Sequence, residues 1–180
     1  MQVAYAIPVQ EDVYDEEALA IAQQSFQFAR NGNTQDLARL LRAGLPANLM
    51  NAQGDSLLIL ASYHGQADTV MLLLAQGADP ETANDRGQTP LAGAAFKGNV
   101  TMMEILVEGG AQVDGTSADG KTPLMYAAMF DQVEAVAFLL RRGANIELAD
   151  TNGVTALGLA RAMGAKRTPE LLLAARHAAH

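Results

Sequence analysis

The chain has 180 residues, which is enough for one folded domain with a buried core. Hydrophobic residues make up 49% and charged residues 18%, a composition that excludes a disordered acidic chain. The net charge of −8 argues against binding to a nucleic-acid backbone, and the absence of cysteine excludes disulfides, thiolate metal sites and cysteine nucleophiles.

The first 15 residues are predicted to form an acidic tail. The segment 1–10 has no basic residue before its first apolar residues, unlike a secretion signal, and no later stretch reaches the length of a membrane span. The acidic run at 11–17 suits the start of a helix, where negative charge is favourable. We therefore expect a capping helix from residue 16, a cytoplasmic protein and no membrane partner.

From residue 32 onward, glycine recurs with a spacing of 33 residues. Three ladders share this period: Gly32, Gly65, Gly98 and Gly164; Gly44, Gly77, Gly110 and Gly143; Gly54, Gly87, Gly120 and Gly153. The first ladder skips one rung, where the sequence has Asp131. A fixed period of this length is the signature of a repeat protein.

Each period is predicted to contain a turn and two short helices. Thr89-Pro90 and Thr122-Pro123 combine a helix-capping residue with proline at the first helical position. In the second half of the period, apolar residues follow helical i, i+3, i+4 spacing, as at Val70, Leu73 and Leu74. Helices this short do not persist alone in water, so we expect them to stack.

The pattern Asp/Asn-x-x-Gly-x-Thr-Pro-Leu-x-x-Ala-Ala-x-x-Gly, followed by x-Leu-Leu-x-x-Gly-Ala, resembles the ankyrin repeat. The best match is 84–111, and the resemblance covers roughly residues 17–178. It implies an all-α solenoid of stacked helix-turn-helix units joined by β-turn loops. The expected units are a capping repeat at 16–50, repeats at 51–83, 84–116 and 117–149, and a final capping repeat at 150–180.

This sequence departs from the family at the histidine that usually follows Thr-Pro-Leu. The four equivalent positions carry Ile59, Ala92, Met125 and Gly158. No hydrogen-bond network through that histidine can form, so the stability of the repeats is expected to depend more on packing.

The sequence offers little for catalysis, and we predict that the protein is not an enzyme. Its histidines are His64, His177 and His180, and it lacks nucleophile-elbow, Walker-type and His-Glu-x-x-His motifs. His177 and His180 are interpreted as part of a frayed end rather than as metal ligands. We expect no cofactor and no metal.

The resemblance implies a concave binding face made of turn tips and outer residues of each first helix. Two neighbouring positions before the middle glycine are rich in aromatic residues and methionine, which are enriched at interface centres. The predicted central residues are Tyr63, His64, Phe96, Lys97, Met129 and Phe130, and the flanking ones are Arg86, Gln88 and Lys121. The alternative, that Phe96 and Phe130 only pack between repeats, stays open.

The predicted function is non-catalytic binding of a client protein, as an inhibitor, an immunity factor or a regulatory factor. The chain resembles the small stand-alone ankyrin proteins of bacteria, and we expect a monomer. One alternative is a small enzyme or ligand-binding protein that uses His64 with Asp55 or Asp85. Another is an accessory subunit that stabilises a neighbouring enzyme.

Overall fold

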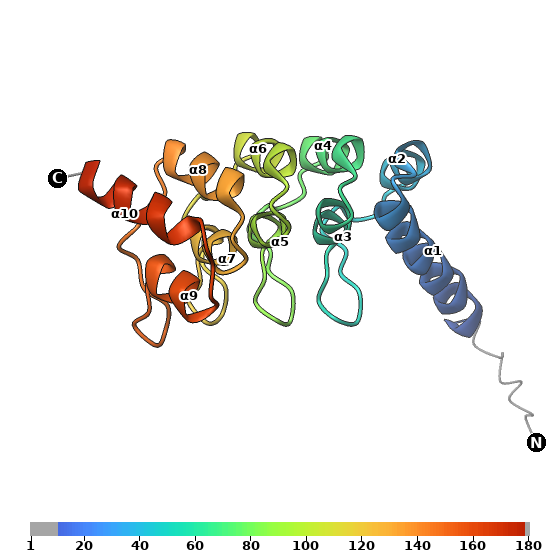
Figure 1. The fold of residues 1–180 in the computed structure, drawn as a ribbon. Coiled ribbons are helices and arrows are strands. Elements are labelled where there is room, and N and C mark those ends of the chain that lie inside the picture. Colours follow the sequence, from blue (N-terminus) through green and yellow to red (C-terminus); the bar gives the residue numbers. More distant parts are fainter. Residues whose placement is uncertain (1–10, 179–180) are drawn as a thin grey trace, which may run out of the picture.

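The described part of the chain folds into ten α-helices joined by loops (Figure 1). The structure is a computed structural model that describes the backbone of residues 11–178 and the side chains of residues 16–178. The helices are α1 (Glu11–Asn31), α2 (Thr34–Arg42), α3 (Leu57–Tyr63), α4 (Ala67–Ala75), α5 (Pro90–Lys97), α6 (Val100–Glu108), α7 (Pro123–Met129), α8 (Val133–Arg141), α9 (Ala156–Ala162) and α10 (Thr168–Ala178). Within these residues no β-strand forms beyond two isolated bridges.

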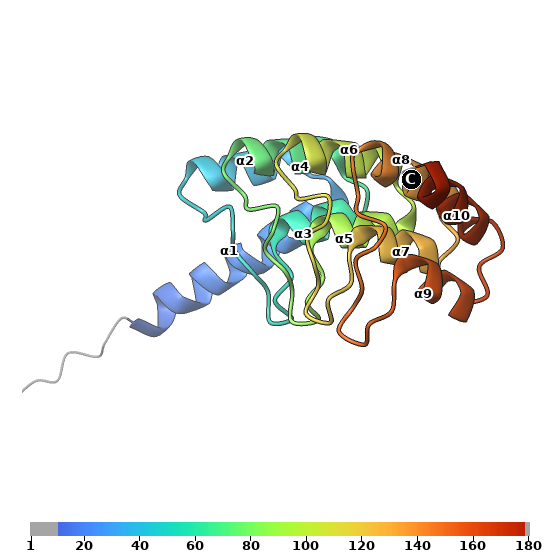
Figure 2. The ribbon, with the colours of Figure 1, turned by 90° about the vertical axis from the view of Figure 1, so that its left-hand side faces the viewer.

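The helices stand in two rows, one for each helix of the repeating pair (Figure 1). In one row α3, α5, α7 and α9 contact their neighbours in turn, and in the other α2, α4, α6, α8 and α10 do so. The long loops between repeats run away from both rows on one side, across the direction of the helices (Figure 2). This arrangement confirms the predicted all-α stack of helix-turn-helix units.

The first helix of each repeat begins at a hydroxyl side chain. The oxygen of Thr89 accepts a hydrogen bond from the backbone N–H of Ala92 at 3.3 Å, and Pro90 follows at the first helical position. The same cap recurs at Ser56, Thr122 and Thr155. The predicted helix starts are therefore confirmed, including the one in which serine replaces threonine.

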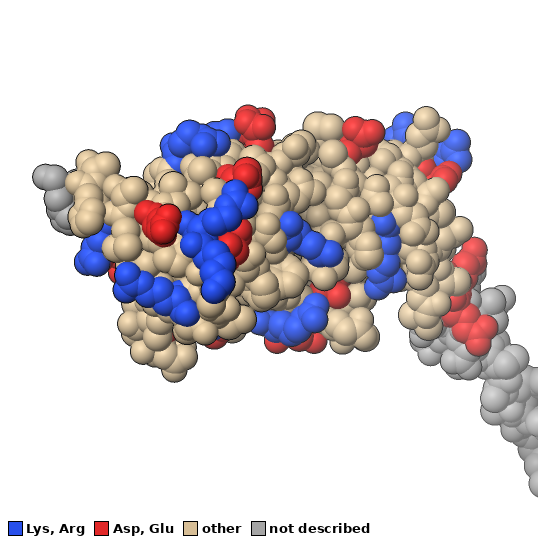
Figure 3. Space-filling model, viewed as in Figure 1, with Lys and Arg blue, Asp and Glu red and all other residues tan. Residues whose placement is uncertain are grey.

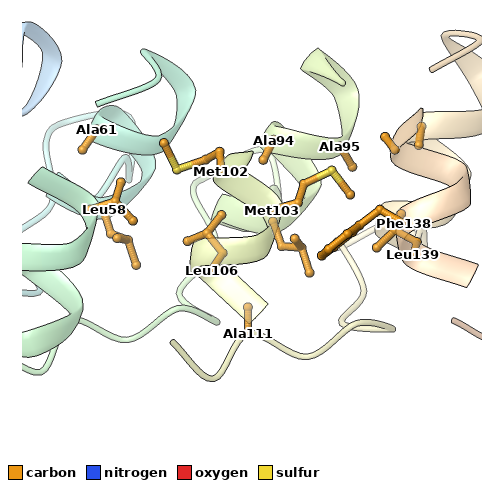
Figure 4. Close-up of a cluster of buried hydrophobic side chains, with 14 of the residues drawn as sticks. Leu58, Ala61, Ala94, Ala95, Met102, Met103, Leu106, Ala111, Phe138 and Leu139 are labelled. Atoms are coloured by element: carbon orange, nitrogen blue, oxygen red, sulfur yellow. The ribbon is translucent and has the colours of Figure 1, made fainter. Parts of the chain in front are cut away.

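A continuous apolar core runs along the stack between the two rows. Met102, Met103 and Leu106 of α6 are buried between neighbouring repeats (Figure 4). Leucine and alanine residues that recur with the same 33-residue spacing also belong to this core: Leu58, Leu91 and Leu124 are buried, as are Ala61, Ala94, Ala127 and Ala160. Each inner repeat is thus covered on both sides by its neighbours, and each terminal repeat on one side.

Each long loop is organised by the first residue of its repeat. The side-chain oxygen of Asn84 accepts hydrogen bonds from the backbone N–H groups of Arg86 at 3.1 Å and Gln88 at 3.0 Å. Asn51 and Asp150 make the same pair of bonds in their own loops. These bonds fix the backbone, so the loop tips are held in place before any partner arrives.

Neighbouring loops are also linked to one another. The backbone N–H of Asp85 donates to the carbonyl of Gln53 at 3.2 Å, and that of Thr151 donates to the carbonyl of Asp119 at 3.1 Å. Among the described residues, no such backbone bond joins the loop at 84–89 to the loop at 117–122. The four loops are therefore tied together in two pairs.

The break in the glycine ladder has a structural explanation. Asp131 keeps the left-handed backbone of the glycines it replaces, with φ of 55°. Its carboxylate accepts hydrogen bonds from the backbone N–H groups of Thr168 at 2.8 Å and Arg167 at 2.9 Å, at the start of α10. These bonds lower the pKa of Asp131 to about 2. The side chain thus caps a helix of the next repeat, which glycine could not do.

We expect Asp131→Asn to be less stable than the native chain at neutral pH, with a Tm lower by a few degrees. A carboxylate whose pKa is lowered on folding stabilises the protein above its unfolded pKa, near 3.8, and loses this contribution as the pH falls towards 2. The difference in Tm between the two proteins should therefore shrink between about pH 4 and pH 2. Circular dichroism melts across this range would test it, and a constant difference would contradict the capping role.

The N-terminal helix begins earlier than expected. Helix α1 starts at Glu11, inside the segment 1–15 assigned to an acidic tail, and runs to Asn31. Glu11, Asp12 and Asp15 lie in the first turns of this helix, where negative charge is favourable. Residues 1–10 of the expected tail, and His180, lie outside the described residues. None of the described helices is both long enough and apolar enough to cross a membrane.

Candidate functional site

The loops and the first helices together form the candidate binding surface. We define the inner face as the surface made by the loops 51–56, 84–89, 117–122 and 150–155 with the adjoining sides of α3, α5, α7 and α9 (Figure 2). A pocket of about 320 Å³ lies on it, between α3, α5 and their loops. Four of the predicted site residues line this pocket: Tyr63, His64, Arg86 and Gln88.

The pocket exists beside a position that lacks a side chain. Gly93 of α5 lines it, while the equivalent positions in the other repeats carry Leu60, Tyr126 and Leu159. A Cβ atom added to Gly93 would lie 3.9 Å from the ring of Tyr63, with nothing nearer, so space is open there. In the next repeat the bulk of Tyr126 takes this place. Gly93 was not among the predicted site residues. A comparison of position 93 with its equivalents at 33-residue spacing would have shown that a large side chain is missing there.

Charged groups from two other segments also reach the pocket. Arg30, at the end of α1, lines it and is half-buried. It stands one period before Tyr63, so the repeat register extended by one step would have found it. Asp55 lines the opposite part, where its carboxylate accepts a hydrogen bond from the side-chain amide of Asn84 at 2.8 Å.

Tyr63 forms an exposed wall of the pocket. Its side chain is 45% exposed, and the ammonium group of Lys97 lies 4.2 Å from the centre of its ring. The His64 ring meets it edge-on, with 5.6 Å between the ring centres. A cation over an aromatic face is attracted to it, so Lys97 holds the ring in place.

The other aromatic residues form a pair across a repeat boundary. The rings of Phe96 and Phe130 meet edge to face, with 4.5 Å between their centres. Phe96 and Met129 are half-buried, while Phe130 remains 41% exposed. The pair thus contributes to packing between repeats and still leaves apolar surface open on the inner face.

Lys121 lies apart from these residues. Its ammonium group forms an ion pair with Asp119 of the same loop and stands 3.8 Å from the carboxylate of Asp150 in the next loop. The hydrogen bond to Asp119 raises the pKa of Lys121, and the same bond lowers the pKa of Asp119. Its side chain is only 16% exposed, so Lys121 ties two loops together rather than offering a free charge to a partner.

His64 and Asp55 line the same pocket, as the enzyme alternative requires. Within residues 16–178, however, no hydrogen bond joins His64 to a carboxylate, and the carboxylate of Asp55 accepts a hydrogen bond from Asn84 instead. Nor do any three acidic or histidine side chains in that range come close enough together to hold a metal ion. The carboxylate of Asp55 is therefore engaged in linking two neighbouring loops.

Comparison with known proteins agrees with this fold. The family model for ankyrin repeats in three copies matches residues 25–117 and again residues 94–179. A relative from Pseudomonas aeruginosa, which carries the provisional name of an ankyrin repeat protein, is 59% identical over 58 residues. That match covers 32% of this chain and 34% of the relative, so the chain spans about a third of that protein's length.

Proposed function

Because this chain belongs to the ankyrin-repeat family, we propose that it works without catalysis, by binding a client protein through its inner face. The ankyrin repeat is in general a protein-interaction module. The observation that carries the proposal is the placement of exposed aromatic side chains, Tyr63 and Phe130, at the same end of the first helices. Tyrosine and phenylalanine are both enriched at the centres of protein interfaces.

The loops support the same conclusion because they are ordered before binding. Side chains such as Asn84 hold each loop through its own backbone N–H groups. A partner would therefore bind a surface whose backbone is already fixed, and little conformational entropy would be lost. We infer that the client is regulated by this binding, with the chain acting as an inhibitor, an immunity factor or a regulatory factor. A monomeric state and a cytoplasmic location stay predictions.

We expect Phe130→Asp to bind the client at least about 30-fold more weakly, the equivalent of a 2 kcal/mol contribution. The substitution places a charge where an apolar contact is proposed. The client would first be isolated by pull-down with the native chain and identified by mass spectrometry. Its affinity for each variant would then be measured by calorimetry, with the Tm of each variant recorded alongside.

Met71→Asp serves as the matched control. Met71 is an equally exposed apolar residue, 48% accessible, but it lies on α4 in the other row of helices. The Met71→Asp variant should bind the client as tightly as the native chain does. Equal binding by Phe130→Asp, or an equal loss in Met71→Asp, would contradict recognition through the inner face.

A further inference from the structure

We propose that the client presents a peptide segment to the inner face, and that one Asp or Glu side chain of this segment enters the pocket beside Gly93. This inference rests on the proposed function, because it specifies the chemistry of the partner. It is carried by two observations. The pocket is open at a position that other repeats fill, and the guanidinium groups that line it have no counter-ion in the described part of the chain.

The shape of the pocket suits a single amphipathic side chain. Its apolar lining comes from Ile59, Leu60 and Pro90, which are largely buried, and its open side is bounded by Tyr63. The methylene groups of a glutamate side chain would pack on this apolar lining. Gly93 leaves the room for them, since a leucine at this position would occupy the same space.

The charges of the pocket select a carboxylate. Within residues 16–178, the side chains of Arg30 and Arg86 make no ion pair and donate no hydrogen bond to another residue. Asp55, the one carboxylate in the lining, accepts its hydrogen bond from Asn84 instead. The planar fork of an arginine matches a carboxylate with two parallel hydrogen bonds, so an entering acid would satisfy groups that are otherwise open.

Some arginines of the outer row of helices have acidic partners, whereas Arg141 of α8 makes no ion pair within residues 16–178. Arg142, which follows α8, lies 3.5 Å from Glu104, and Arg176 of α10 pairs with Glu147 at 2.8 Å. On the face shown in Figure 3, Lys and Arg side chains occur along the whole length of the stack. Near the pocket the remaining cation, Lys97, lies on the Tyr63 ring instead of on a carboxylate. Although the chain carries a net charge of −8, the two arginines of the pocket, Arg30 and Arg86, have no ion-pair partner within residues 16–178.

A peptide segment fits these features better than a nucleic acid does. Asp55, Asp85 and Asp119 stand on the loops of the same face, and they would repel a continuous phosphate backbone. An acidic side chain followed by an apolar one would instead place its charge in the pocket and its apolar neighbour on the exposed Tyr63 or Phe130.

The test uses a random-sequence peptide library displayed on phage and selected on the full chain. We expect the enriched peptides to carry Asp or Glu next to an apolar residue, and their affinity to fall as salt is added. Measured by fluorescence anisotropy, a selected peptide should bind Gly93→Leu and Arg86→Glu at least tenfold more weakly. Arg141→Glu, at the exposed end of α8, is the charge-matched control and should bind normally.

Gly93→Leu separates binding from folding. Leucine favours helix more than glycine does, and the position has an ordinary helical backbone, so the Tm of this variant should equal or exceed the native Tm. Lost peptide binding with an unchanged or higher Tm would then report on the pocket alone.

Several results would overturn the inference. The selection would contradict it if neutral or basic peptides were enriched, or if no peptide were selected. Unchanged binding of acidic peptides to Gly93→Leu would also contradict it. Competition by free glutamate at the concentration of the peptide itself would indicate a small-molecule site instead. Each of these leaves the proposed function standing if Phe130→Asp still loses the client. If the client binds Phe130→Asp and Gly93→Leu as it binds the native chain, the proposed function fails as well.

Discussion

Gly87→Ala is expected to lower the free energy of unfolding by about 2–5 kcal/mol, which combines the cost of a left-handed backbone with that of overpacking. Gly87 ends the turn of its loop with φ of +72°. A Cβ atom there would lie 2.5 Å from the backbone nitrogen of Ala118 in the next loop, a distance that forces the backbone to move. Chemical denaturation followed by circular dichroism would measure the loss.

Gly153→Ala is the matched control for this prediction. Gly153 holds the same register position with φ of +76°, but it belongs to the last repeat, and a Cβ atom there meets nothing within 4 Å. Only the backbone cost of about 1–2 kcal/mol should remain. Equal losses in the two variants would show that the approach of Ala118 to Gly87 contributes nothing to stability.

Leu106→Ala is expected to destabilise the chain by about 2–5 kcal/mol, the usual cost of truncating a fully buried leucine. Leu106 lies in the middle of the stack on α6, which contacts α4, α5 and α8. Because each repeat is stabilised by its neighbours, a cavity here should weaken both halves of the molecule. A single unfolding transition at a lower Tm is the expected result.

Two further variants locate the effect. Leu172→Ala removes the equivalent buried leucine from α10, which has a neighbouring repeat on one side only. Its cavity should loosen the last repeat first, seen as earlier hydrogen exchange in α9 and α10. Met71→Ala changes an exposed residue and should alter stability by less than about 0.5 kcal/mol. A loss confined to one repeat in Leu106→Ala would contradict coupling along the stack.

Much of the fold could be predicted from the sequence because repetition makes its signals add up. One capping serine or threonine, or one glycine, is weak evidence for a helix end, yet four of each in register indicate where the helices start and end. Residues outside the register were harder to interpret. The start of α1 at Glu11 was missed because no repeat-based signal marks it. The role of Asp131 was missed because its cap belongs to a helix 37 residues further along the chain.

The candidate site was predictable only in part. The register placed Tyr63, His64, Arg86 and Gln88 on one face, and the structure brings these four residues to one pocket. The pocket itself depends on a missing side chain at Gly93, and a pattern of residues that are present does not reveal an empty space. Lys121 shows the converse limit. Its sequence position suggested a free charge, whereas two carboxylates from separate loops hold it.

The pairing of the loops determines how firmly the two sides of the pocket are held together. The bond between Asp85 and Gln53 joins the loops on either side of the pocket, and the bond between Thr151 and Asp119 joins the other two. The junction without such a bond is bridged at the helix ends by the rings of Phe96 and Phe130. We therefore expect the shape of the pocket to change little when a client binds, because the backbone bond between Asp85 and Gln53 and the hydrogen bond from Asn84 to Asp55 hold its two sides together.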